Sequence, residues 1–589
     1  MSWTVWRSQK LAGGASPNED RRTAATSSLS MNRPTPTPPR RGPDKAPLLG
    51  VVGVGSESPC AREVRGVLSW ESRVTVLTSP RAESFFQQRT SSGKSFFGWL
   101  LVPFFVTVLS AADWPQYRGS NHDGISTETI RVNWSKESPR QIWKVPLDDA
   151  LSSFAIGGGR AFTQARRLVG NRGQEFCIAL NADTGKELWA TPLDSADYDS
   201  GAGFGDGPRS TPSVDGDRVY VLTSYLRMAC LEAASGRTIW KRDLVAEYGG
   251  SVITWQNAAS PLIVGDLVFM NCNAARQRLL ALRKQDGSVA WTGQDDQMTQ
   301  ATPVAATVAG VPQVIFFAQS GLVSVAPETG AVLWRYPFPY SVSTAASPVI
   351  ANDVVYCSAA YGMGAGAVQI RRNGEALGAS QIWRTPGANM NHWATPVYHE
   401  GYFYGVYGQS LLTLRCIDAA TGIEKWKQSG VGYGSVLFVA GHVLVLTDQG
   451  DLVLVKPDPT AYREVSRFKA VNGKCWNVPA ISNGRLYVRS TSEAVCLDLS
   501  PPSLPKLRLH SIIASDGGSF QILLGTEDRS PLDSDRAAKI SLFSTSDLAT
   551  GPTGWVKLRS DPVLTNGQLR LEAQGSAEPQ LFFKAIEQP

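Results

Sequence analysis

The chain has 589 residues, of which 42% are hydrophobic and 18% charged, and it contains 55 Gly and 36 Pro. This composition excludes fibrous, collagen-like and wholly disordered proteins and indicates a turn-rich globular protein. The formal net charge is +6, but residues 1–94 hold 14 Lys/Arg against 7 Asp/Glu, which leaves 43 against 44 for residues 95–589. Because the body of the protein has no basic excess to bind a phosphate backbone, nucleic acid is not an expected partner.

The N-terminal part is interpreted as a tail followed by an export signal. Residues 1–94 are rich in Arg, Pro, Ser and Thr and show no helical or strand period, so they are either a disordered basic tail or sequence upstream of the true start. Residues 95–112 contain an apolar run, Phe96 to Leu109, after a basic flank and before small residues. This pattern is typical of an export signal, and the run is shorter than the about 20 residues of a membrane span. We therefore predict an exported protein, periplasmic or extracellular, that touches a membrane only if the signal stays uncleaved.

After a lead-in over residues 113–140, an internal repeat dominates the chain. Strings such as ALNADTGKELW from Ala179 and CLEAASGRTIW from Cys230 place Trp four residues after Gly. The aromatic residue recurs every 42 to 51 residues, and this period suits the four-stranded blade of a propeller. The aromatic positions of the copies are Trp143, Trp189, Trp240, Trp291, Trp334, Trp383, Trp426 and, in a decayed copy, Phe468.

Each repeat unit also carries a hairpin signal ahead of the Gly-x-x-x-Trp string. An apolar run, a Gly, Asn or Asp turn and a β-branched or aromatic run follow one another, as in TPSVDGDRVYVLTS from Thr211. Two hairpins per unit and eight units predict an all-β, eight-bladed β-propeller of four-stranded blades over residues 141–500. Because the last unit, from Val478, has only three strands, the strand from Gln141 to Pro146 is expected to complete it and cover its edge.

The tryptophans of the repeat are expected to dock between neighbouring blades, each burying about 150–250 Å² of surface. They are structural residues in this interpretation, and no catalytic residue is assigned. Cys230, Cys416 and Cys496 share one repeat position that Ala or Ser occupies in other units, so this position needs a small buried side chain. Equivalent positions on different blades lie too far apart for disulfides, and mostly free thiols are expected.

In the form A-x-[DE]-x-x-[TS]-G-x-x-x-W, the repeat resembles the tryptophan-docking repeat of the pyrroloquinoline-quinone (PQQ) propeller superfamily. The resemblance covers residues 113–500, and the lead-in DWPQYRGSNHDGIS is similar to the N-terminal segment of secreted PQQ-like repeat proteins. The superfamily includes quinoprotein dehydrogenases, which bind PQQ and Ca²⁺ over the channel, and non-catalytic scaffolds of the BamB type. The adjacent cysteine pair of the quinoprotein alcohol dehydrogenases is missing here, and so is the lipoprotein cysteine of BamB.

The favoured hypothesis is an exported, monomeric, non-catalytic scaffold that needs no cofactor and binds a protein or polysaccharide of the envelope. The alternative is a PQQ-dependent oxidoreductase, with Ca²⁺, acting on an alcohol or sugar. No spacing of His, Cys or carboxylate residues predicts a metal site.

The candidate ligand site lies at the channel mouth, where the loops lead into the first strand of each blade. Polar and aromatic residues at these points would form a ring around an anionic or sugar-like ligand. The other interpretation is that they satisfy loop backbone groups and plug the channel. The candidates are Arg209, Asn257, Gln300, His392, Trp393, Trp476 and Asn477.

A second domain follows the propeller. Residues 501–509 are a Pro-rich linker, and in residues 510–589 the docking repeat is absent. Runs such as GQLRLEA alternate apolar and polar residues, which predicts a small C-terminal β-sandwich module.

Overall fold

The computed structural model describes residues 113–198, 206–340, 342, 344–501, 504–515, 519–547, 554–558, 562–574 and 582–587. The predicted tail and export signal lie outside these residues. The described residues are almost entirely β-structure, with two short helices, α1 (Leu244–Tyr248) and α2 (Ser534–Ala538). Neither described helix has the length and apolar character needed to cross a membrane.

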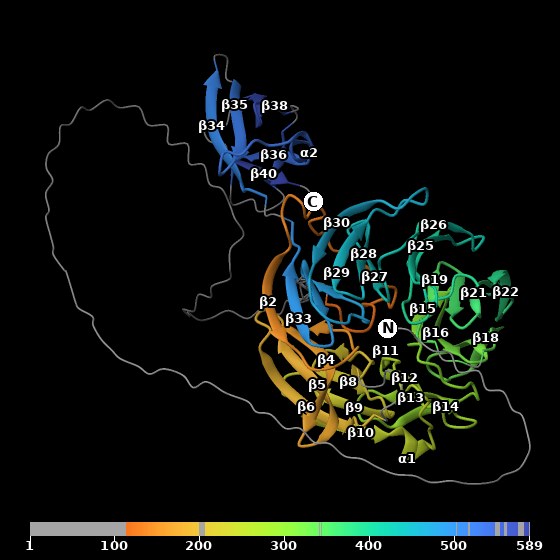
Figure 1. The fold of residues 1–589 in the computed structure, drawn as a ribbon. Helices are drawn as coiled ribbons and strands as arrows, with labels where there is room; N and C mark the ends of the chain where they lie inside the picture. Colours follow the sequence, from red (N-terminus) through yellow and green to blue (C-terminus); the bar gives the residue numbers. More distant parts are fainter. Residues whose placement is uncertain are drawn as a thin grey trace, which may run out of the picture. The chain divides into compact units, whose positions relative to one another are not determined.

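Between residues 113 and 501 the described strands form eight sheets, here numbered in chain order, and Figure 1 shows them following one another around a ring. The first four sheets consist of β3 (Ala155–Gly157), β4 (Arg160–Val169), β5 (Arg172–Asn181) and β6 (Glu187–Ser195); β7 (Ser213–Asp215), β8 (Arg218–Leu222), β9 (Arg227–Glu232) and β10 (Thr238–Asp243); β11 (Leu262–Val264), β12 (Leu267–Asn271), β13 (Leu279–Arg283) and β14 (Val289–Gly293); and β15 (Val304–Val308), β16 (Val311–Ala318), β17 (Gly321–Val325) and β18 (Val332–Pro337).

The remaining four sheets continue around the ring. They consist of β19 (Val349–Ala351), β20 (Val354–Ala359), β21 (Gly364–Asn373) and β22 (Ala376–Thr385); β23 (Val397–His399), β24 (Tyr402–Tyr407), β25 (Thr413–Asp418) and β26 (Glu424–Gln428); β27 (Ser435–Val439), β28 (His442–Leu446), β29 (Asp451–Val455) and β30 (Glu464–Lys469), with β1 (Ile125–Ser126) as a fifth strand; and β31 (Ala480–Ser482), β32 (Arg485–Arg489), β33 (Glu493–Asp498) and β2 (Arg140–Pro146).

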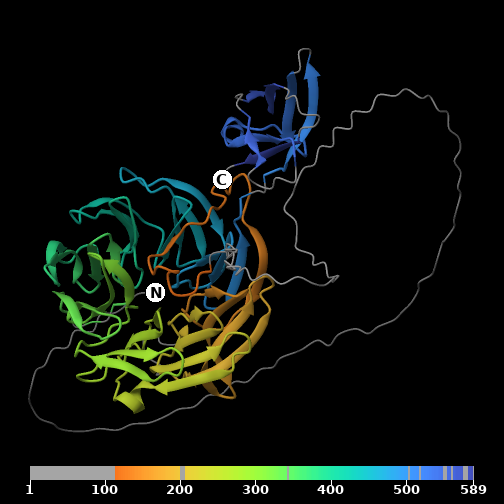
Figure 2. The ribbon, with the colours of Figure 1, turned by 180° about the vertical axis from the view of Figure 1, so that it is seen from behind.

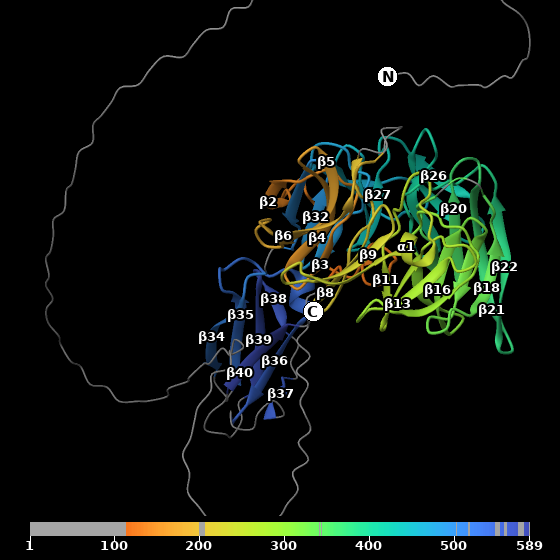
Figure 3. The same ribbon diagram turned by 90° about the horizontal axis from the view of Figure 1, so that it is seen from below.

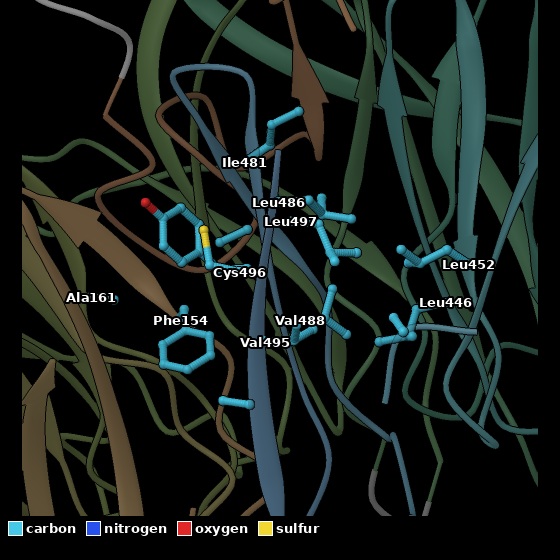
Figure 4. Close-up of a cluster of buried hydrophobic side chains, with 14 of the residues drawn as sticks. Phe154, Ala161, Leu446, Leu452, Ile481, Leu486, Val488, Val495, Cys496 and Leu497 are labelled. Atoms are coloured by element: carbon cyan, nitrogen blue, oxygen red, sulfur yellow. The ribbon is translucent and has the colours of Figure 1, made fainter. Parts of the chain in front are cut away.

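Closure of the ring is made by β2. This strand precedes the first sheet in the chain but pairs antiparallel with β33 of the eighth sheet, with Gln141 opposite Leu497. The prediction that the N-terminal strand completes the last unit is confirmed. Figure 2 shows the ring from behind, and Figure 4 shows the apolar contact beside the closure, where Leu446 and Leu452 of the seventh sheet lie next to Leu486 and Leu497 of the eighth.

The docking tryptophans explain why Gly and Trp recur together in the repeat. Trp240 lies opposite Cys230 in its own sheet, and its Nε1 donates to the carbonyl of Lys284 in the next sheet at 3.1 Å. Its ring covers Gly287, whose missing Cβ would stand 2.7 Å from the indole. Five such contacts join consecutive sheets: Trp143 on Gly185, Trp189 on Gly236, Trp240 on Gly287, Trp291 on Gly330 and Trp383 on Gly422. Each turn glycine thus receives the indole of the preceding sheet.

Trp334 departs from the predicted pattern. Its Nε1 donates to Oε1 of Gln313 in its own sheet at 2.5 Å, and the turn glycine of the fifth sheet, Gly374, has nothing within 4 Å of its Cβ position. The reason is the position of the receiving turn, because Gly374 precedes Trp383 by nine residues whereas Gly287 precedes Trp291 by four, so β21 and β22 carry their turn past the indole. Trp334 still packs in one apolar cluster with Val368 of the fifth sheet.

The seven described cysteines are all buried and free, as the sequence predicts. Cys230, Cys416 and Cys496 each lie opposite a docking tryptophan, namely Trp240, Trp426 and Trp143. The small side chain at this repeat position therefore makes room for the indole.

The described C-terminal residues form two further sheets (Figure 3). One sheet has the order β34 (Leu507–Ser515), β35 (Ser519–Thr526), β39 (Gln568–Gln574) and β38 (Val563–Thr565), and the other the order β37 (Val556–Lys557), β36 (Ile540–Thr545) and β40 (Phe582–Glu587). The predicted linker boundary is wrong, because β34 begins at Leu507, inside residues 501–509. Pro505 is the last residue that cannot donate to a ladder, so pairing starts two residues later.

Candidate functional site

The lead-in segment crosses the central channel of the ring. The carbonyl of Pro115 accepts from the backbone N–H of Val214 in the second sheet at 2.7 Å. Three residues later, the Arg118 guanidinium donates to the carbonyls of Thr395 (2.9 Å) and Pro396 (2.8 Å) at the head of the sixth sheet. Because the second and sixth sheets lie opposite each other in a ring of eight, residues 115–118 span the channel.

Arg118 is almost fully buried, with 1% of its surface exposed, and burial lowers the pKa of its guanidinium. Its two terminal nitrogens donate to backbone carbonyls, including that of Asp123 at 2.7 Å, while its Nε has no partner in the described residues. Farther along, His122 contacts the amide of Gln116 at 3.0 Å, and burial lowers the pKa of His122 to about 4. The lead-in is therefore a built part of the channel, held by charge-assisted bonds from Arg118 and by the bond between Gln116 and His122.

A ring of hydroxyl groups joins the heads of the innermost strands. At five of the eight junctions, a backbone N–H just before a first strand donates to the hydroxyl of the corresponding residue in the next sheet. The pairs are Ser153 to Thr211 (3.1 Å), Thr211 to Ser260 (2.9 Å), Ser260 to Thr302 (3.0 Å), Ser347 to Thr395 (2.9 Å) and Val478 to Ser153 (2.9 Å). Sequence reasoning missed this ring, although its signal, Ser-Pro or Thr-Pro at the head of the unit, recurs in the sequence.

Three of the predicted ligand residues serve the loops themselves. The Asn257 side chain, 1% exposed, donates to the carbonyls of Thr223 and Ala259 at 3.3 and 3.0 Å. Arg209 and Gln300 converge on the carbonyl of Trp255, at 3.1 and 3.0 Å. For these residues the structure favours the loop-satisfying interpretation.

The other predicted residues come together in an aromatic cluster. Ring centroids of Trp393, Tyr433 and Trp476 lie 4.6 to 4.9 Å apart, and the His392 ring is 4.4 Å from Trp393. Tyr361 adds an edge contact to His392 at 5.0 Å. Tyr361 was not predicted, because it lies in the turn between β20 and β21, and Tyr433 was missed although it lies two residues before β27. We call Tyr361, His392, Trp393, Tyr433 and Trp476 the aromatic cluster.

Polar groups border this cluster. Nζ of Lys474 lies 3.6 Å from the Trp476 ring and 2.5 Å from the Asp206 carboxylate. Asn477, which follows Trp476 in the chain, is 4% exposed, and neither its amide nitrogen nor its amide oxygen has a hydrogen-bond partner in the described part of the chain. The same holds for Nδ1 of His392, whose pKa burial lowers to about 4.

A buried carboxyl group lies at the junction of the first and second sheets. Glu175 of β5 is 0% exposed and accepts from the Tyr198 hydroxyl at 2.6 Å and from the Ser224 backbone at 3.2 Å. Burial raises its pKa to about 7. No sequence pattern marked this residue, because its partners come from two different loops.

Three loop carboxylates that could ligate calcium are paired with cations in the described residues. No group of three or more His, Cys, Asp or Glu residues is placed to hold a metal ion in the described ranges. The loop carboxylates Asp206, Asp295 and Asp296 pair instead with Lys474, Arg278 and Arg335, at 2.5, 2.8 and 2.8 Å. A calcium ion would have to displace these cations.

Comparison with known proteins finds similarity to BamB proteins. A family model described as outer membrane protein assembly factor BamB matches residues 197–398. BamB of Moranella endobia (strain PCIT) is 24% identical over 332 residues, covering 54% of this chain and 70% of that protein. BamB of Yersinia pestis is 20% identical over 390 residues, covering 64% and 93%. These matches, together with the repeat, support the PQQ-like propeller superfamily for the repeat region.

Two solved structures are similar to this chain at low identity. BamB from Moraxella catarrhalis is 15% identical, with a TM-score of 0.45 and coverage of 62% of this chain and 99% of that one. Quinohemoprotein alcohol dehydrogenase from Comamonas testosteroni is 12% identical, with a TM-score of 0.48 and coverage of 69% and 83%. Likeness of fold does not choose between these functions.

Proposed function

We propose that this PQQ-like propeller is an exported, non-catalytic scaffold of the cell envelope, acting as a monomer, and that it binds an envelope protein or polysaccharide through its loop face. The loop face is the end of the ring where loops enter the innermost strands. The relatives named outer membrane protein assembly factor support an envelope location. The apolar segment of residues 95–112 supports export.

The aromatic cluster carries this proposal. It is built by loops that precede β23, β27 and β31, together with the β20–β21 turn, all at one end of the ring. Tyr361 keeps 42% of its surface exposed, and Leu411 in the neighbouring β24–β25 turn keeps 86%. Partly exposed aromatic and apolar side chains on a rigid frame are typical of recognition surfaces. The lead-in crosses the channel behind them, and this supports binding on the face.

Site-specific photo-crosslinking tests the loop face. A crosslinker at Tyr361 or Leu411 is expected to capture one envelope component in cells, whereas a crosslinker at Asp217 is expected to capture none. Asp217 is a matched control, because its side chain is 91% exposed in the β7–β8 turn at the other end of the sheets. Equal capture from all three positions would contradict the assignment.

Two further measurements separate the scaffold from the enzyme. N-terminal sequencing of protein from the envelope fraction is expected to begin at Asp113, after cleavage behind Ala112. Titration with PQQ and Ca²⁺, followed by dye-linked oxidation of alcohols and sugars, is expected to show neither stoichiometric binding nor turnover. Turnover at the rates of an enzyme would overturn the non-catalytic assignment.

A further inference from the structure

The aromatic cluster has a chemistry more specific than that of a general docking surface. Three rings with centroids 4.6 to 4.9 Å apart give a rigid apolar platform. The residue that follows Trp476, Asn477, carries a buried amide whose nitrogen and oxygen no described residue uses. Buried polar groups in native proteins are usually paired, so an unpaired amide next to a partly open site is a group available to a ligand or to water.

The charges around the cluster select the class of ligand. The cation at its border, Lys474, is neutralised by Asp206 at 2.5 Å. His392 is neutral at physiological pH, because burial lowers its pKa to about 4. Arg209 lies apart, bonded to the loop of Trp255. An anionic ligand would find no free positive charge among these residues, which argues against one of the two ligand classes that the sequence predicts.

We propose that the aromatic cluster and Asn477 form a subsite for a neutral saccharide chain. This inference rests on the proposed function and deepens it, since it chooses a polysaccharide as the ligand of the loop face. A sugar ring presents an apolar C–H face, which suits aromatic contact, and hydroxyl groups, which both donate to and accept from an amide. Nδ1 of His392 would accept or donate one further hydroxyl bond.

The test is a titration of the purified protein, followed by calorimetry and tryptophan fluorescence. The probes are maltohexaose, cellohexaose and laminarihexaose as neutral chains, hexagalacturonate as an anionic chain, and a proline-rich decapeptide as a protein-like ligand. At least one neutral hexasaccharide is expected to bind saturably and to change the fluorescence, while the anionic chain and the peptide are not.

Asn477→Leu separates binding from folding. Leucine has a similar volume and removes two buried polar atoms that lack partners, so the melting temperature is expected to equal or exceed that of the wild type. Loss of the amide is expected to weaken saccharide binding about tenfold or more, as two hydrogen bonds are lost. Trp476→Ala is expected to weaken binding to a similar extent, whereas Trp255→Ala, at a 39% exposed tryptophan outside the cluster, changes the affinity less than about twofold.

Several outcomes would overturn the saccharide subsite. These are absence of binding by all three neutral chains, unchanged affinity in Asn477→Leu, or binding of only hexagalacturonate or the peptide. If crosslinking from the loop face still succeeds in that case, the scaffold proposal stands and only the ligand class is wrong. If neither experiment succeeds, both fail together.

Discussion

Two junctions of the ring use the same residue type in different ways. Between the second and third sheets, Trp240 reaches across to the carbonyl of Lys284 and covers Gly287. Between the fourth and fifth sheets, Trp334 bonds to Gln313 in its own sheet. There the contact is made by other groups, with the Tyr336 hydroxyl donating to Gln381 at 2.8 Å and the Arg384 guanidinium 3.6 Å from the Phe338 ring. A docking tryptophan thus joins two sheets only where the receiving hairpin keeps its turn within reach.

The hydroxyl ring shows the same contrast. The Ser260 hydroxyl accepts from the Thr211 backbone at the ordinary junction, at 2.9 Å. At the fourth-to-fifth junction the Ser347 hydroxyl, 2% exposed, has no partner among the described residues. The tryptophan contact and the hydroxyl contact therefore both differ at the junction of the fourth and fifth sheets.

Removal of a docking indole is expected to have the largest effect on stability. Trp240→Ala is expected to lower the free energy of unfolding by about 3–5 kcal/mol, because a buried aromatic side chain is replaced by a cavity between two sheets. Urea denaturation measures this loss, with Trp255→Ala as a partly exposed control. A Trp240→Ala protein that unfolds like the wild type would show that the indole does not join the sheets.

The turn glycines offer a matched pair. Gly287→Ala places a methyl group 2.7 Å from the Trp240 ring at φ +71°, and it is expected to cost about 3 kcal/mol through overpacking and backbone strain. Gly374→Ala, at φ +63° with open space around it, is expected to cost only the strain of about 1–2 kcal/mol. Thermal unfolding of both variants measures the difference, and equal losses would contradict the contrast between the junctions.

The junction of the first and second sheets is expected to respond to pH through Glu175. Its pKa of about 7 in the folded state exceeds the ordinary value, so the folded protein holds this proton more tightly than the unfolded chain. The resulting stability is fully present below about pH 4.5 and is lost as pH rises towards 7.

Glu175→Gln keeps the neutral, hydrogen-bonding form at every pH. It is expected to remove the pH-dependent loss of stability, so that the variant is more stable than the wild type by about 3 kcal/mol above pH 7 and nearly equal to it below pH 4.5. Unfolding by urea at pH 4.5, 6 and 8 checks this. If the free energy of unfolding changed with pH in the same way in both proteins, the pH dependence could not be assigned to Glu175.

The smallest effects on stability are expected from the hydroxyl groups of Ser260 and Ser347, which differ in their hydrogen bonding. Ser260→Ala leaves the buried Thr211 N–H without an acceptor and is expected to cost about 1–2 kcal/mol. Ser347→Ala removes a hydroxyl that has no hydrogen-bond partner among the described residues, and no loss of stability is expected. If both variants lost the same stability, the ring would be continuous in solution.

Local repetition made most of the fold predictable. The sheets, their four strands, the closure by residues 141–146 and the small residue opposite each indole all follow from patterns within one unit of the repeat. The hydrogen bond of Trp334 within its own sheet could not be predicted from one unit, because it depends on where the turn of the next unit lies. Arg118 could not be placed either, since its partners are the backbone carbonyls of Thr395 and Pro396, which any residue would supply.

The candidate site was predictable in part. The positions just before the first strands include His392, Trp393 and Trp476, which the structure brings together. The same rule also selected Asn257, whose amide donates to the backbone carbonyls of Thr223 and Ala259. Polarity at a loop position does not tell whether a side chain is free, because that depends on which carbonyls the fold brings near it.

Pairing of β2 with β33 has a consequence for synthesis of the chain. Residue 141 emerges from the ribosome long before residue 497, its partner, exists. Throughout that interval the first strand presents unsatisfied backbone groups, and unpaired strand edges are prone to join other chains. A circular permutant that starts after β2 and carries this strand at its C-terminal end would shorten the time between synthesis of β2 and of β33. It is expected to speed productive folding and to reduce aggregation of newly made protein.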